Sequence, residues 1–161
     1  MRLLIAAVGR LKAGPERELL ARYVERANAS GKSLSLAPLD IVEISESPAQ
    51  TATKRKTDEA KALLAAIPEK AKIIALDERG KNVSSEDFSN RLARLRDDGA
   101  ACTAFMIGGA DGLDETLRKK ADIVIGFGAA TFPHQLVRIL LAEQIYRAVT
   151  ILSGHPYHRG G

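Results

Sequence analysis

The chain has 161 residues, of which 45% are hydrophobic and 27% are charged. This composition excludes a disordered chain, and the length predicts a single domain over residues 1–161 that buries a core of its own. The 24 Lys and Arg residues exceed the 20 Asp and Glu residues only slightly. Such an excess permits a nucleic-acid partner but does not require one.

The one cysteine and the lack of long apolar stretches bear on location. Cys102 lies in the apolar run Ala101–Ile107, so we expect a small buried residue and a reducing, cytoplasmic compartment. The apolar runs are shorter than the roughly 18–20 residues of a membrane span, so no membrane association is expected. Met1–Arg10 is interpreted as a first strand rather than a signal peptide, because Gly9 and Arg10 interrupt the apolar run early.

Five apolar runs have the length and composition of buried strands. They are Arg2–Val8, Leu34–Ile44, Lys72–Leu76, Ala101–Ile107 and Asp122–Phe127. Pro38 leaves two alternatives open for the second run, which is either one edge strand or a loop followed by a strand. The sequence DERGK after the third run is interpreted as a turn.

Five helices are predicted between and after these strands. They are Pro15–Ala29, Thr53–Ile67, Ser84–Arg96, Asp114–Lys120 and Pro133–Ser153. The third has a clear start, because Ser84 is a good N-cap and acidic residues follow it in the first turn. Strands that alternate with helices predict an α/β fold, a mostly parallel sheet with helices on both faces.

Glycines gather where the predicted strands end. Gly108, Gly109 and Gly112 follow the fourth strand, and Gly126 and Gly128 mark the end of the fifth. One interpretation is a tight turn between strand and helix. The other is a ligand site, because open α/β sheets bind ligands at the carboxyl ends of their strands and glycines let backbone approach a flat group such as adenine. The number of glycines favours the ligand site.

Several common site motifs are missing from the sequence. The turn reads GGADG rather than GxGxxG, and neither a P-loop nor a GxSxG elbow occurs. His155 and His158 have HxxH spacing, but His134 and Cys102 fall on other predicted elements, so no metal is expected.

Two basic segments each allow two interpretations. The cluster Lys54–Lys56 opposes the dipole of its helix, and it is either a solvated face or a patch that faces phosphate. The tail His155–Arg159 either stacks on bases and pairs with phosphate, or folds back over the preceding helix. Arg138 and Arg147 are nine residues apart on that helix, which is 2.5 turns, so they cannot both serve one pocket of one subunit.

Four stretches together resemble the ribosomal RNA large subunit methyltransferase H family, of the SPOUT class. They are IGGADG, TFPHQLVR, AEQIYRA and the ending HPYHR, and MRLLIAAVGRLK and LDERGK extend the likeness over nearly the whole chain. The resemblance implies a C-terminal trefoil knot, which no strand pattern can reveal. It also implies a homodimer that binds S-adenosylmethionine and methylates N3 of a pseudouridine in the 23S rRNA of assembled ribosomes.

The resemblance further implies roles for individual residues. The positions that match cofactor contacts are Leu76, Gly108, Gly109, Gly128, Ala129, Ala130, Thr131, Phe132 and Pro133. Tyr157, His158 and Arg159 match a tail implicated in RNA binding and activity, and His134 and Arg138 match the motif after the cofactor loop. The chain departs from relatives with Leu at position 132 and Pro at position 135, and it ends in Gly160 and Gly161.

Transfer of a methyl group from a sulfonium needs no metal, but it needs the nitrogen about 3–3.5 Å from the methyl group and in line with the C–S bond. We predict that His158 or His134 removes the N3 proton and that Arg159 or Arg138 steadies the developing anion, with the tail of one subunit serving the cofactor of the other. The long last helix is the predicted dimer element. Two other classes remain open: a nucleotide-binding enzyme of flavodoxin or dehydrogenase type, and a non-catalytic ribosome-binding protein.

Overall fold

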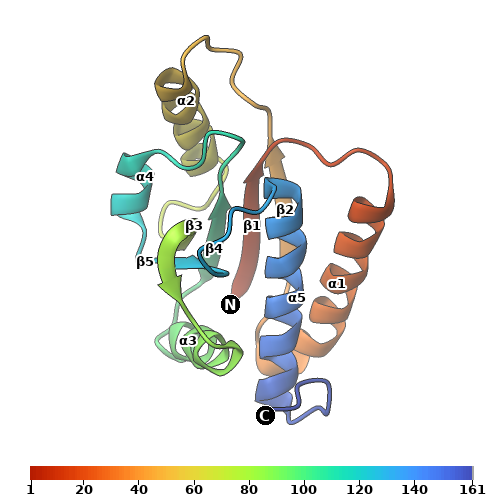
Figure 1. Cartoon of the computed structure of the whole chain (residues 1–161). Coiled ribbons are helices and arrows are strands. Elements are labelled where there is room, and N and C mark those ends of the chain that lie inside the picture. Colours follow the sequence, from red (N-terminus) through yellow and green to blue (C-terminus); the bar gives the residue numbers. More distant parts are fainter. Residues whose placement is uncertain (161) are drawn as a thin grey trace.

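The protein folds around one five-stranded sheet in the order β2-β1-β4-β3-β5 (Figure 1). The computed structural model describes residues 1–160, so Gly161 at the end of the predicted domain lies outside the described residues. The strands are β1 (Arg2–Val8), β2 (Leu39–Ile44), β3 (Lys72–Asn82), β4 (Cys102–Ile107) and β5 (Ile123–Gly126). Every neighbouring pair is parallel, which confirms the predicted parallel sheet and brings all the carboxyl ends to one edge.

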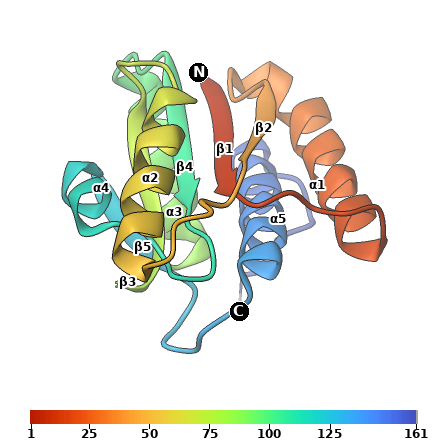
Figure 2. The ribbon, with the colours of Figure 1, turned by 90° about the horizontal axis from the view of Figure 1, so that it is seen from above.

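Helices cover both faces of the sheet. They are α1 (Pro15–Gly31), α2 (Ala52–Ala65), α3 (Ser85–Asp97), α4 (Glu115–Lys120) and α5 (His134–Ser153), and a 3₁₀ turn, η1, spans Lys32–Leu34. The helices α1, α3 and α5 pack on one face, with α1 and α5 side by side (Figures 1 and 2). The helices α2 and α4 pack on the other face.

The interior position of β1 in the sheet explains why its sequence is a continuous apolar run. Leu3 and Ile5 belong to the core under α1, α3 and α5, whereas Ala6 and Val8 belong to the core under α2 and α4. Because successive side chains of a strand point to opposite faces, a strand covered on both sides must be apolar throughout. Cys102 is buried as predicted.

The predicted turn over DERGK is wrong, because β3 continues to Asn82. Leu76 and Lys81 both pair with Ile125 of β5, and the residues between them form an irregularity of the bulge type. Gly80 makes the close approach possible, since a Cβ there would lie 2.5 Å from the carbonyl carbon of Ile125. The bulge directs Asp77 and its neighbours toward the edge where the strands end.

The predicted run Leu34–Ile44 is a loop followed by a strand, which was one of its two alternatives. Residues 32–34 form η1, the Ala37–Pro38 peptide bond is cis, and β2 starts at Leu39. β2 is an edge strand. Ser84 caps α3 as predicted, its hydroxyl oxygen accepting a hydrogen bond from the Asp87 amide at 3.0 Å. Over residues 1–160, the helices lack the combination of length and apolarity that crossing a bilayer would need.

Candidate active site

A cavity of about 580 Å³ opens at the carboxyl edge of the sheet, a volume within the usual range for small-molecule sites. Its walls come from the ends of β3, β4 and β5 and from the start of α5. The lining includes all but one of the predicted cofactor residues: Leu76, Gly108, Gly109, Gly128, Ala130, Thr131, Phe132 and Pro133. Ala129 alone of the set is outside the lining. The structure therefore brings residues from three strand ends to one cavity.

The glycine turn after β4 forms one wall and is folded tightly on itself. The Gly112 amide donates to the Gly109 carbonyl at 3.0 Å. A Cβ at Gly108 would lie 2.6 Å from the carbonyl group of Gly112, and Gly112 itself has a φ of +82°. Only glycine fits such an approach at position 108, so backbone rather than side chains forms this wall.

The connection from β5 to α5 forms the opposite wall and loops away from the sheet before it returns to α5 (Figure 2). Gly128 has a φ of +112°. The Thr131 hydroxyl donates to a carboxylate oxygen of Glu78 at 2.6 Å, which links this connection to the extended part of β3. His134, the first residue of α5, also lines the cavity, so the structure places one of the two candidate bases there.

Asp77 supplies a buried carboxylate to the same cavity. Its side chain is 6% exposed and accepts hydrogen bonds from the Arg79 amide at 2.9 Å and from the Arg79 guanidinium at 3.0 Å. Burial acts to raise the pKa of Asp77, but the hydrogen bonds from Arg79 outweigh it and the pKa is lowered. The cavity wall therefore holds an ionised carboxylate that is paired with Arg79 and lies 3.6 Å from Arg118.

Arg138 does not face the cavity, although the sequence predicted that it would steady an anion there. Its side chain is fully buried and donates to the Val8 carbonyl at 3.0 Å, to the Gly9 carbonyl at 3.2 Å and to Glu43 at 2.6 Å. Val8 is the last residue of β1, and Gly9 follows it directly. The guanidinium thus stabilises the edge of the sheet beside the cavity.

The tail folds back over α5 of the same chain, which is the second of the two alternatives for this segment. His158 lies 2.6 Å from Glu86 of α3 and 3.3 Å from Arg147 of α5. The Tyr157 hydroxyl donates to Glu143 at 3.1 Å, and its ring lies 4.7 Å from that of Tyr146. Arg159 is exposed.

Tail and cavity lie well apart within the chain. Arg147, which contacts His158, comes thirteen residues after His134 on the same helix. At 1.5 Å per residue this separation is roughly 20 Å along the helix axis. The prediction that Arg138 and Arg147 serve different places is confirmed, since one contacts the end of β1 and the other contacts the tail.

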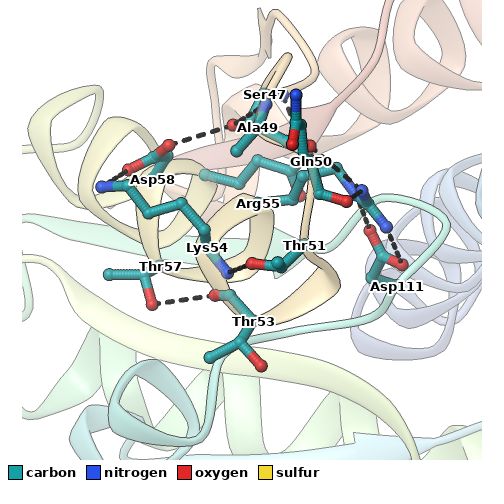
Figure 3. Close-up of polar contacts among 11 residues, drawn as sticks. Ser47, Ala49, Gln50, Thr51, Thr53, Lys54, Arg55, Thr57, Asp58 and Asp111 are labelled. Atoms are coloured by element: carbon teal, nitrogen blue, oxygen red, sulfur yellow. Dashed lines mark hydrogen bonds and ion pairs between the residues drawn. The ribbon is translucent and has the colours of Figure 1, made fainter.

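The residues of the basic cluster Lys54–Lys56, at the start of α2, differ in their contacts, so the cluster as a whole is neither a solvated face nor a patch that faces phosphate. Arg55 donates to both carboxylate oxygens of Asp111, at 2.7 and 3.1 Å, and to the carbonyls of Ala49 and Gln50 at 3.0 Å each (Figure 3). Lys54 pairs with Asp58 at 2.8 Å and remains mostly exposed. The Arg55–Asp111 pair joins residues 56 positions apart, so no spacing rule could have found it.

Comparisons with known proteins decide the family. A family model described as "Predicted SPOUT methyltransferase" matches residues 1–158. A protein of Xanthobacter autotrophicus named "Ribosomal RNA large subunit methyltransferase H" is 59% identical over 159 residues, which is 99% of each chain. The chain belongs to the ribosomal RNA large subunit methyltransferase H family, of the SPOUT class.

Further relatives agree with that assignment. A protein of the same name from a Bradyrhizobium species is 56% identical over 159 residues, 99% of this chain and 98% of the relative. A solved structure of a probable methylase family protein from Haemophilus influenzae covers 99% of this chain and 70% of that one, with a TM-score of 0.51 and 9% identity, and it supports the fold alone. The family resemblance predicted from the sequence is confirmed.

Proposed function

We propose that this protein is an S-adenosylmethionine-dependent methyltransferase that modifies N3 of a pseudouridine in the 23S rRNA of assembled ribosomes, in the cytoplasm. The observation that carries the proposal is the cavity lined by backbone at three strand ends, in a chain of this family. In the proposed fold, the C-terminal segment that lines the cavity belongs to a trefoil knot.

The cavity suits the proposed cofactor in size and chemistry. The glycine turn lines the cavity with backbone, and backbone amides and carbonyls are groups that can read the edge of an adenine. A side chain at position 108 would clash with the backbone of Gly112. Leu76 and Phe132 supply apolar contact, and the Asp77 carboxylate, paired with Arg79, lies in the cavity wall. When bound, S-adenosylmethionine supplies an electrophilic methyl group on a sulfonium.

The residues of this chain then have two tasks in the proposed reaction. They hold the pseudouridine nitrogen in line with the methyl group, and they remove the proton from N3 as the new N–C bond forms. His134 lines the cavity and is one candidate for the base. His158 is the other, with Arg159 as the group that steadies the anion. Arg138 stabilises the backbone beside the site, since its guanidinium donates to the Val8 and Gly9 carbonyls at the end of β1.

A homodimer would explain how a tail that lies far from the cavity of its own chain takes part in the reaction. Because the tail docks roughly 20 Å along α5 from His134, it reaches a cavity more readily if that cavity belongs to a second copy of the chain. Leu136 and Leu140 are 43% and 37% exposed on one side of α5, and Leu19 of the adjacent α1 is 37% exposed. We infer that these exposed leucines contact a second copy, in keeping with α5 as the dimer element.

Transfer of labelled methyl from S-adenosylmethionine to unmethylated ribosomes tests the proposal, with protein-free 23S rRNA as a parallel substrate. We expect label on ribosomes only, because a small domain with a net charge of +4 has little surface with which to bind RNA alone. Label on free rRNA would keep the chemistry and exclude the need for an assembled particle. A folded protein that labels neither substrate would contradict the proposal and favour a non-catalytic ribosome-binding protein.

A further inference from the structure

We propose that Arg55 is a positioning residue for the cofactor: through Asp111 it holds the glycine turn in the shape that forms the wall of the cavity. This inference rests on the proposed function. Asp111 lines the cavity, whereas Arg55 lies behind it on α2 and contacts the cavity only through Asp111.

The pair has the geometry of a rigid contact. Two parallel hydrogen bonds, at 2.7 and 3.1 Å, join the guanidinium to the Asp111 carboxylate (Figure 3). Such bidentate pairs fix orientation as well as distance. The two side chains are 30% and 25% exposed, so the pair is more sheltered than the surface pair Arg2–Asp40, with 44% and 43%.

Arg55 also joins a third segment to this contact. The other end of its guanidinium donates to the carbonyls of Ala49 and Gln50, in the loop that leads into α2 (Figure 3). Around one side chain, the structure thus gathers the loop before α2, the helix itself and the glycine turn. A guanidinium can do this because its five donors point in fixed directions, which an ammonium cannot reproduce.

Two more residues of α2 lie against the same turn and the start of α4. The Thr57 hydroxyl lies 3.4 Å from Asp114, the N-cap of α4. Glu59 is 5% exposed, and a Cβ at Gly109 would come within 3.3 Å of its carboxylate and within 3.0 Å of Val8. The underside of the turn is therefore closely packed, and Arg55 restrains its tip.

A restraint of this kind is needed because of how the turn is built. Its three glycines allow many backbone conformations, and each conformation that the cofactor does not accept lowers the population able to bind it. Arg55 also occupies the first turn of α2, where the helix dipole disfavours a cation. Asp111 and the two carbonyls compensate for that unfavourable position, which a solvated arginine would not require.

The experiment compares Arg55→Gln, Asp111→Asn, the double variant and Arg55→Lys, with calorimetric binding of S-adenosylmethionine as the main measurement. We expect the dissociation constant of Arg55→Gln to rise about tenfold, on the scale of one charge-assisted pair, and that of Arg55→Lys to rise less. The double variant should bind about as well as either single variant, because both break the same contact. Turnover at saturating cofactor should stay within about twofold of wild type.

Arg2→Gln is the matched control, since it removes one positive charge from an ion pair at the opposite edge of the sheet. Its cofactor affinity should equal that of wild type. Wild-type affinity in Arg55→Gln, or a double variant whose loss equals the sum of the single losses, would overturn the inference while leaving the proposed function intact.

Hydrogen exchange of the Gly109 and Gly112 amides in the free protein tests the Arg55–Asp111 clamp on the glycine turn independently of the proposed function. Faster exchange in Arg55→Gln than in Arg2→Gln supports the clamp. Equal exchange overturns it, whether or not the wild-type protein binds S-adenosylmethionine. Absence of binding by the wild type would instead count against the proposed function.

Discussion

The two ends of α5 differ in how the candidate site is built, because glycine backbone shapes much of the cavity at the start of α5 whereas side-chain contacts hold the tail at its end. Near His134 the cavity walls are a glycine turn and a loop with one further glycine at a positive φ. Near Arg147 the tail is held by an aromatic contact and by bonds from Tyr157 and His158 to acidic residues. The shape of the first end therefore depends on glycines that carry no side chain, whereas the second end depends on contacts between side chains.

This difference bears on how the two ends would work together. Backbone groups keep their positions as long as the turn keeps its shape, whereas a tail held by a few partly buried side-chain contacts can leave its place without unfolding of the domain. A preformed cavity and a detachable tail are what a site shared between two subunits would need. Changes at either end test this difference.

Removing residues 157–161 should cause the largest loss. If the tail presents the nucleotide, methyl transfer to ribosomes should fall by about 1000-fold, the scale of losing groups that act on the transition state. Cofactor affinity, measured by calorimetry, should remain that of wild type. Mixing this variant with Gly108→Ala should restore part of the transfer, since a mixed dimer would have one intact tail and one intact cavity. Lost cofactor binding in the truncated protein would contradict the separation of the two ends.

Arg138→Met should lower the free energy of unfolding by about 3 kcal/mol, toward the low end for a broken buried ion pair because Glu43 is 32% exposed. Urea unfolding measures this loss. Adding Glu43→Leu should recover part of this loss, because it removes the Glu43 carboxylate that Arg138→Met leaves without the guanidinium. A stable Arg138→Met protein without transfer activity would return Arg138 to the catalytic role predicted from the sequence.

Gly108→Ala should weaken cofactor binding by about 30-fold, because the new methyl group would meet the backbone of Gly112 at 2.6 Å and force the turn open. Gly99→Ala is a control away from the cavity, since nothing lies within 4 Å of its Cβ and its strain comes only from a φ of +82°. The docked tail should not respond to either change. Unaltered affinity in Gly108→Ala would show that the turn does not contact the cofactor.

Tyr157 gives the smallest effect, and it is visible only at high pH. Burial, with the Glu143 carboxylate as a further cause, raises the pKa of Tyr157 to about 12. A raised pKa means that docking stabilises the neutral phenol: this stabilisation is complete below pH 10 and is lost as the pH rises toward 12. Absorbance titration of phenolate, with Tyr157→Phe to identify its signal, should show Tyr157 ionising near pH 12. Ionisation near pH 10 would show that the tail is not docked.

The sequence alone determined the elements and the edge where the site forms. Apolar periodicity located the five strands, and the Ser84 cap located the start of α3, because both depend on residues a few positions apart. The position of glycines at strand ends predicted the cavity, since the carboxyl ends of parallel strands share one edge. The bulge in β3 escaped prediction because DERGK has turn-like composition, and pairing with β5 decides its conformation.

Only the tertiary structure decided which charged groups meet. Arg55 and Asp111 are 56 positions apart, His158 and Glu86 are 72 apart, and Arg138 and Glu43 are 95 apart. Local spacing carries no information on such pairs, because the packing of whole helices against the sheet sets the distance between them. For this reason the sequence could identify Arg55, Arg138 and the tail as unusual, but the fold had to show that each is bound to an acidic partner.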